Sequence, residues 1–159
     1  VISDEGLRLQ PGHLERHPFA QGPAPLLDWH DWGLEHFSGR VEYTFRFPVA
    51  DEFLTQTVLL DLGAVYWSAQ IHLNGTRLPD CLWAPHTVDL GAALRGGENE
   101  LVITVANTLA DAITAPEVVA HAAANGWLNP YWQRAVPMME DRRAGLLGPV
   151  RVLVLPATE

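Results

Sequence analysis

The chain has 159 residues, 48% of them hydrophobic, which is enough for one domain that closes a sizeable core. Ten arginines, no lysine and nineteen acidic residues give a formal net charge of −9, which opposes binding to nucleic acid or to an anionic membrane surface. The single cysteine, Cys81, excludes an intramolecular disulfide, and no run approaches the roughly 20 apolar residues of a membrane span.

Residues 1–39 predict an irregular wrap, because four prolines interrupt them and they show no sustained helix or strand period. The first four residues contain neither an initiator methionine nor a signal-peptide pattern, so we expect a soluble piece of a longer or processed polypeptide, its compartment open. His13 with His17, and His30 with Asp31, are suitable metal ligands. Spacing fixes no third ligand for either pair, so no metal site is expected.

Residues 40–108 are expected to form the core strands. Large apolar residues alternate with polar ones over residues 41–47, which indicates a half-buried strand that Pro48 closes. The apolar run over residues 57–62 predicts a more buried strand that ends at Gly63.

A further strand leads into a tight hairpin. Trp67 shares the apolar phase of this strand with Ala69 and Ile71, which favours packing of its side chain in the core over stacking on a ligand. The strand runs into Asn74-Gly75, a pair typical of a type I′ turn because both turn positions need positive φ, so their role is structural. More strand-like segments follow at residues 76–78, 83–90 and 101–107, with a turn at residues 96–97.

Residues 109–148 show no strand pattern and predict a long loop, with a short helix over residues 116–124 that has proline near its first turn. The apolar run within residues 149–155 predicts a closing strand, buried on both faces or closing the sheet. Short strands at regular spacing favour an all-β fold, an antiparallel jelly-roll β-sandwich with one long loop excursion that contains a short helix. Residues 1–159 are expected to form this single domain.

Several short motifs follow one another in order along the chain: SGRVEY (38–43), LDLGAV (60–65), AQIHLNG (69–75), VDL (88–90), GENELVITVANTL (97–109) and GLLGPVR (145–151). Together they resemble the sugar-binding-type jelly roll of family 2 glycoside hydrolases and the related galactose-binding-like module of α-L-rhamnosidase-like enzymes. The resemblance covers Phe37 to Leu155 and implies a galactose-binding-like β-sandwich attached to a hydrolase. It transfers no catalytic residue, because in these enzymes the catalytic carboxylates sit in a separate domain. No enzymatic activity is therefore expected of this chain alone.

Sugars present an apolar face of C–H groups and a rim of hydroxyls, so a sugar site needs flat aromatic surface beside amide or guanidinium groups. Two loop-like stretches supply such residues. The candidate sugar-binding residues are Trp127, Asn129, Tyr131, Trp132 and Arg134, with Trp83 and His86 in the second stretch. The alternative is that Trp127 and Trp132 plug the end of the sandwich or bury against a catalytic domain. Galactose-binding-like folds sometimes hold a structural calcium, which the sequence neither supports nor excludes, and no other cofactor is expected.

The leading hypothesis is a non-catalytic accessory module that binds carbohydrate or supports the cleft of a glycoside hydrolase, with carbohydrate or the catalytic domain as its partner. A second is a structural protein–protein interaction domain without sugar affinity. A third is a small independent hydrolase, which would need two carboxylates about 5 to 10 Å apart across a cleft. The carboxylates available by number alone are Glu35, Asp61, Asp89, Glu140 and Asp141.

Overall fold

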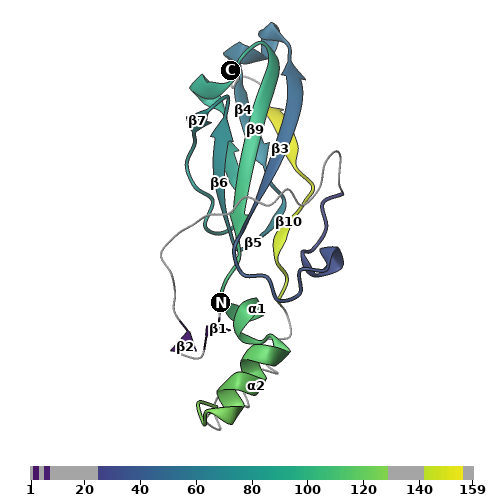
Figure 1. Ribbon diagram of the computed structural model, residues 1–159. Coiled ribbons are helices and arrows are strands. Elements are labelled where there is room, and N and C mark those ends of the chain that lie inside the picture. Colours follow the sequence, from purple (N-terminus) through teal and green to yellow (C-terminus); the bar gives the residue numbers. More distant parts are fainter. Residues whose placement is uncertain (1, 4–5, 8–24, 129–141, 156–159) are drawn as a thin grey trace.

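Antiparallel sheets are the main regular structure in the part of the chain that the computed structural model describes, residues 2–3, 6–7, 25–128 and 142–155 (Figure 1). The strands are β1 (Ile2–Ser3), β2 (Gly6–Leu7), β3 (Arg40–Val49), β4 (Thr57–Asp61), β5 (Ala64–Tyr66), β6 (Ser68–Leu73), β7 (Thr76–Arg77), β8 (Thr87–Asp89), β9 (Gly97–Ala106), β10 (Gly145–Gly148) and β11 (Arg151–Leu155). The helices are α1 (Ala110–Ile113) and α2 (Pro116–Ala124), with 3-10 turns at His30–Trp32, Asp51–Thr55 and Gly91–Ala93.

Two sheets enclose the core. One has the strand order β3-β9-β6-β7 and the other the order β11-β4-β8, while β5 pairs with β10 and β1 with β2. Every pairing between these strands is antiparallel. The helices α1 and α2 lie beyond one end of the strands rather than across a sheet face (Figure 1). The predicted all-β sandwich is confirmed, and so is the short helix α2, which begins at Pro116.

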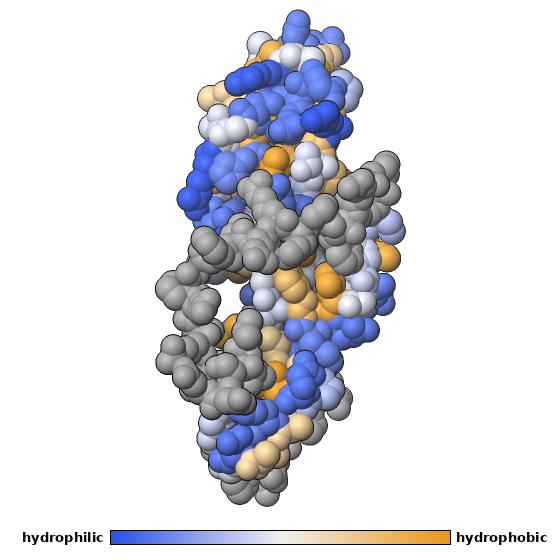
Figure 2. Space-filling model, viewed as in Figure 1, coloured by the Kyte–Doolittle hydropathy of each residue, from blue (hydrophilic) through white to orange (hydrophobic). Residues whose placement is uncertain are grey.

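Alternation along the strands sorts the side chains into a core face and a solvent face. On β9, Leu101, Ile103 and Val105 are buried, and the register places β3 on one side of them and β6 on the other. On β4, in the opposite sheet, the side chains of Val58 and Leu60 are buried in the same core. Full burial of each such side chain stabilises the fold by about 1.5–3 kcal/mol. The outer face over the upper part of β3 and β9 is largely hydrophilic (Figure 2).

The predicted hairpin is confirmed, because Asn74 has φ 52 and Gly75 has φ 80, as a type I′ turn requires. The Asn74 side chain also donates to the Ala93 carbonyl and to Asn99 Oδ1, both at 2.8 Å. Asn99 is fully buried, and its amide group donates to the carbonyls of Arg95 and Gly97. The turn is therefore tied to the start of β9.

A close approach of two backbones explains the glycine between β4 and β5. Gly63 has φ +64, and a Cβ at this position would overlap the carbonyl of Gly148. The β4–β11 and β5–β10 ladders meet at these two glycines, because the register passes from Arg151↔Asp61 to Gly148↔Ala64. Only glycine allows the two ladders to approach so closely here.

The segment before β3 contributes more than the irregular wrap that was expected. Trp29 is fully buried in the core, and its Nε1–H donates to the Tyr43 hydroxyl at 2.7 Å. The Leu146 N–H donates to the same oxygen at 3.2 Å. The Tyr43 hydroxyl thus joins the N-terminal segment, β3 and β10.

Three details of the sequence prediction were wrong. Residues 109–148, expected to lack strands, contain β10 at their end. The strand that Pro48 was expected to close continues to Val49, with Pro48 on its solvent face. Of the two alternatives for the closing strand β11, burial on both faces is wrong, because its apolar side chains, Val152 to Leu155, are 38–41% exposed, whereas its place at the edge of its sheet fits a strand that closes the sheet. An edge strand has a neighbour on one side only, and a sequence pattern does not distinguish it from a central strand.

Among the described residues, no helix has the length and apolar character needed to cross a membrane.

Candidate functional site

Two exposed tryptophans lie on either side of a short β-bridge. Ala69 of β6 and Cys81, in the segment between β7 and β8, exchange two backbone hydrogen bonds of 2.8 and 2.9 Å, and both side chains are buried. Trp67 precedes Ala69 by two residues and Trp83 follows Cys81 by two. Their side chains are 53% and 76% exposed.

The expectation that Trp67 packs in the core was therefore wrong. Strand β5 ends at Tyr66 and β6 begins at Ser68, so the alternation that buries Ala69 does not extend back through Trp67. Its backbone N–H is nevertheless held, because it donates to the Ala106 carbonyl of β9 at 3.2 Å. The backbone of Trp67 is fixed while the indole faces solvent.

The ring of Tyr66 contacts the indole of Trp67. Its ring stands nearly perpendicular to that of Trp67, at 88° with 6.4 Å between centroids. The guanidinium of Arg143 lies 4.8 Å from the centre of the Tyr66 ring, a cation–π contact. The β5–β10 ladder fixes this contact, because it pairs Tyr66 with Gly145, two residues beyond Arg143. Tyr66 is partly buried, whereas Trp67 and Trp83 are exposed.

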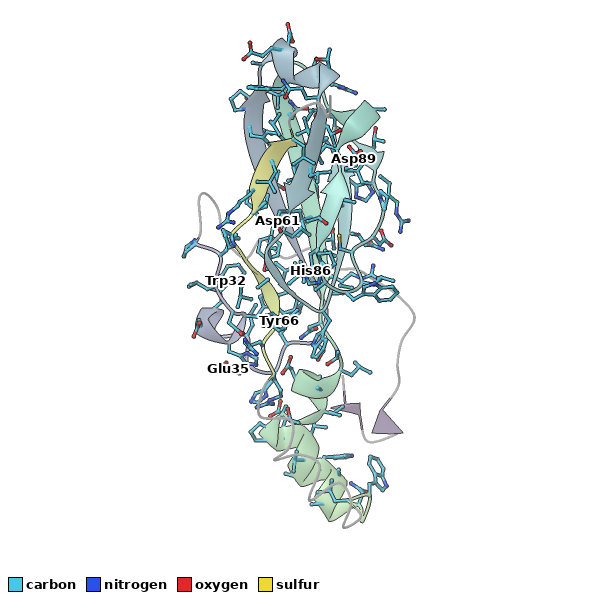
Figure 3. All side chains as sticks on the ribbon, turned by 180° about the vertical axis from the view of Figure 1, so that it is seen from behind. Trp32, Glu35, Asp61, Tyr66, His86 and Asp89 are labelled. Carbon is cyan, nitrogen blue, oxygen red and sulfur yellow. The ribbon has the colours of Figure 1, made fainter. Side chains whose placement is uncertain are left out.

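His86, a candidate from the sequence, has a structural partner. Its Nδ1–H donates to the Gly63 carbonyl at 3.2 Å, and its own carbonyl accepts from the Leu62 N–H at 2.9 Å. Figure 3 shows His86 and Tyr66 near the same end of the strands, the end closer to the helices. His86 therefore holds the loop between β7 and β8, which also carries Trp83, against the end of β4.

Trp127 belongs to a different part of the molecule. It follows α2, is 54% exposed, and makes an edge contact with His121 at 5.4 Å between ring centroids. Helix α2 extends away from the strands (Figure 1). The other candidates of the same stretch, Asn129, Tyr131, Trp132 and Arg134, lie outside the described residues.

A buried polar cluster, which the sequence did not reveal, joins α1 to the rest of the fold. Asp111 is 3% exposed, and its Oδ2 accepts from the Asn107 amide at 2.8 Å. Its Oδ1 has no hydrogen bond of good geometry within the described residues, but lies 3.4 Å from His30 Nε2 and 3.9 Å from Arg142 Nε. His30 Nδ1 lies 2.7 Å from Asp28. These residues are far apart in the sequence, so no spacing rule signals the cluster.

The described carboxylates among those counted for catalysis lie apart from one another. Figure 3 shows Glu35, Asp61 and Asp89 spread along the length of the molecule. Asp61 accepts from the Gly63 N–H at 2.9 Å and Asp89 from the Gly91 N–H at 2.8 Å, so both cap turns. Glu140 and Asp141 lie outside the described residues. Within the described residues, no group of three or more His, Cys, Asp or Glu side chains could hold a metal ion.

Comparison with known proteins relates the chain to glycoside hydrolases, although no family model matches it. A protein of Formosa agariphila named "Putative beta-glucuronidase" is 27% identical over 146 residues, which cover 77% of this chain and 13% of that protein. The solved structure of a rhamnosidase from Novosphingobium sp. PP1Y is 30% identical, with a TM-score of 0.57, and the match covers 76% of this chain and 11% of that one.

A β-glucuronidase of Bifidobacterium dentium is 30% identical, with a TM-score of 0.43, over 46% of this chain and 12% of that one. The chain thus spans only 11–13% of the length of these relatives. It contains a β-sandwich related to a part of these glycoside hydrolases.

Proposed function

We propose that the chain is a non-catalytic accessory module of a glycoside hydrolase, of the galactose-binding-like jelly-roll type, and that it contacts carbohydrate. Its relation to about one tenth of much longer glycoside hydrolases supports the accessory role. The observation that carries the carbohydrate contact is the exposure of Trp67, whose backbone N–H is bound to β9, and of Trp83, two residues after the Ala69–Cys81 bridge. Large aromatic side chains exposed in this way mark interaction sites, and flat indoles suit the apolar face of a sugar ring.

The residues proposed from the sequence remain part of this proposal. Trp83 is exposed two residues after the Ala69–Cys81 bridge, and Trp127 is exposed after the end of α2. We propose Asn129, Tyr131, Trp132 and Arg134 as contributors to a sugar contact beside Trp127, because they combine aromatic rings with amide and guanidinium donors. His86 contributes by holding the loop of Trp83.

A glycan panel tests this function directly. Oligosaccharides containing rhamnose or galactose are titrated into the chain and into the Trp132→Ala variant, with binding measured by calorimetry. Saturable binding of at least one saccharide by the wild-type chain is the expected result. If neither protein binds any saccharide, the carbohydrate contact is wrong and only a supporting role beside a catalytic domain remains.

The second candidate function is a structural interaction domain, and the exposed edge strand β11 favours it. The side chains from Val152 to Leu155 expose apolar surface on a strand that, among the described residues, pairs on one side only. Under this function, a Leu153→Lys substitution abolishes concentration-dependent association, measured by sedimentation, while saccharide titrations show no binding. Saccharide binding that is equal in the wild type and in Leu153→Lys would count against the structural interaction function.

A further inference from the structure

The segment that contains α1 and α2 is joined to the β-sandwich in a different way from the strands. Residues 109–128, which also contain Trp127, are called the helical unit below. We propose, independently of the carbohydrate contact, that the helical unit undocks from the sandwich while the sandwich stays folded. The buried carboxylate of Asp111 is the anchor that holds it in the docked position.

The helical unit supplies almost no side chain to the hydrophobic core. Helix α2 has no buried residue, and Leu109, at the start of the unit, is 62% exposed. Among the described residues of the unit, Ala115 is the one buried apolar side chain, and it is not a member of the core cluster of the sandwich. Since apolar burial is the main source of folding free energy, separation of the unit from the sandwich loses little of it.

Polar contacts of Asp111 join α1 to segments that are far apart in the sequence. Its Oδ2 accepts from the amide of Asn107, which follows β9, at 2.8 Å. Its Oδ1 lies 3.4 Å from His30 Nε2, in the segment before β3, and 3.9 Å from Arg142 Nε, in the segment before β10. The guanidinium of Arg142 also donates to the Thr114 hydroxyl at the end of α1. One carboxylate of the helical unit therefore contacts three segments of the sandwich.

The docked state leaves this carboxylate only partly compensated. Asp111 is 3% exposed, and its Oδ1 has no hydrogen bond of good geometry within the described residues. A buried polar atom without such a bond retains part of its desolvation cost. Undocking returns the oxygen to water, so the free energy that keeps the unit docked is small compared with that of the sandwich, whose core is apolar.

Undocking changes the arrangement of the exposed tryptophans. Trp127 contacts His121 of α2, so it moves with the helical unit. The Trp67 N–H is bound to β9, and Trp83 follows the Ala69–Cys81 bridge, so both stay with the sandwich. Helix α2 extends away from the strands, where no described strand obstructs its movement (Figure 1). The position of Trp127 relative to the other two is therefore variable.

Hydrogen exchange of the backbone amides in the whole chain, followed by mass spectrometry at increasing urea, tests this inference. In the wild type, the amides of α1 and α2 are expected to exchange through an opening that depends less on urea than the opening of β9 does, because it exposes less surface. In Asp111→Ala, exchange in α1 and α2 is expected to be about thirtyfold faster or more, because a buried charge pair loses one member. Exchange in β9 is expected to stay unchanged.

Glu117→Ala is the matched control, because it removes an exposed carboxylate from the same helical unit. It is expected to change exchange in α2 by at most about fivefold, the usual limit for a charge in the first turn of a helix. Equal urea dependence of exchange in α2 and β9 of the wild type would overturn undocking, and it decides even if Asp111→Ala does not fold. Unchanged exchange of α1 and α2 in Asp111→Ala, or equal acceleration in β9, would overturn the role of Asp111 as the anchor.

Discussion

Tyr43 shows how a single hydroxyl can join distant parts of this chain. It accepts hydrogen bonds from the buried Trp29 indole and from the Leu146 backbone, which is 103 positions away in the sequence. Gly145 lies so close to the Trp29 ring that an added Cβ would overlap it. The N-terminal segment and β10 therefore depend on the same group of β3.

Tyr43→Phe is expected to destabilise the fold, because it leaves the Trp29 Nε1–H and the Leu146 N–H buried without an acceptor. The free energy of unfolding should fall by about 1–3 kcal/mol per unpaired buried group. Urea denaturation followed by circular dichroism measures it, with Tyr66→Phe as the control, since the Tyr66 ring is only partly buried. Equal stability of Tyr43→Phe and the wild type would contradict this role of the hydroxyl.

The same residue predicts a loss of stability at alkaline pH. Burial raises the pKa of Tyr43 despite the hydrogen bonds from Trp29 and Leu146, which lower it. Its contribution is therefore complete below the ordinary tyrosine pKa of about 10 and is lost as the pH rises through the higher pKa of the folded state. Between about pH 8 and about pH 11, the free energy of unfolding should fall more steeply for the wild type than for Tyr43→Phe. If the free energy of unfolding changes equally with pH in the wild type and in Tyr43→Phe, the pKa of Tyr43 is the same in the folded and unfolded states.

Among the elements, the junction of the β4–β11 and β5–β10 ladders depends on Gly63. Gly63→Ala places a Cβ against the Gly148 carbonyl and also imposes a side chain at positive φ. Gly33→Ala has the second effect alone, because Gly33 has φ +77 and open space around it. The Gly33 variant should lose about 1–2 kcal/mol of stability, and the Gly63 variant should lose about 1–3 kcal/mol more through steric overlap. If Gly63→Ala and Gly33→Ala lower the free energy of unfolding equally in urea denaturation, the overlap with the Gly148 carbonyl does not destabilise the fold.

Local patterns predicted the elements whose structure is set locally. Period-two alternation predicted β3, β6 and β9, and Asn74-Gly75 predicted the type I′ turn, because neighbouring residues fix both features. Trp67 was wrongly placed because one break between β5 and β6 interrupts the alternation. The exposure of β11 and the burial of Asp111 depend on contacts between distant segments, which no local pattern contains.

The candidate site could be predicted only in part. The chemistry of sugar recognition singled out Trp83 and Trp127, and both are exposed. The exposure of Trp67 and the Ala69–Cys81 bridge near Trp83 were not predicted, because the bridge joins a strand to a residue far from it in the sequence. His86 has the right chemistry for a ligand contact, but its ring is bound to the Gly63 carbonyl.

At the scale of the whole molecule, the β-sandwich carries the exposed Trp67 and Trp83 outside its core. Beside the hydrophilic outer face of the larger sheet, the exposed tryptophans and the β11 edge are apolar surfaces that the described residues offer to partners. The exposed tryptophans suit contact with a saccharide, and the β11 edge suits contact with a protein. An accessory module between a glycan and a catalytic domain would use both.

The most direct test of this account is an equilibrium titration of the chain with a neutral galactose or rhamnose oligosaccharide, followed by chromatography of the recovered sugar. We predict saturable binding and recovery of the oligosaccharide intact, because the described residues present exposed tryptophans and the candidate carboxylates Glu35, Asp61 and Asp89 lie apart. Release of shorter sugars would contradict the non-catalytic role, and absence of binding would contradict the carbohydrate contact.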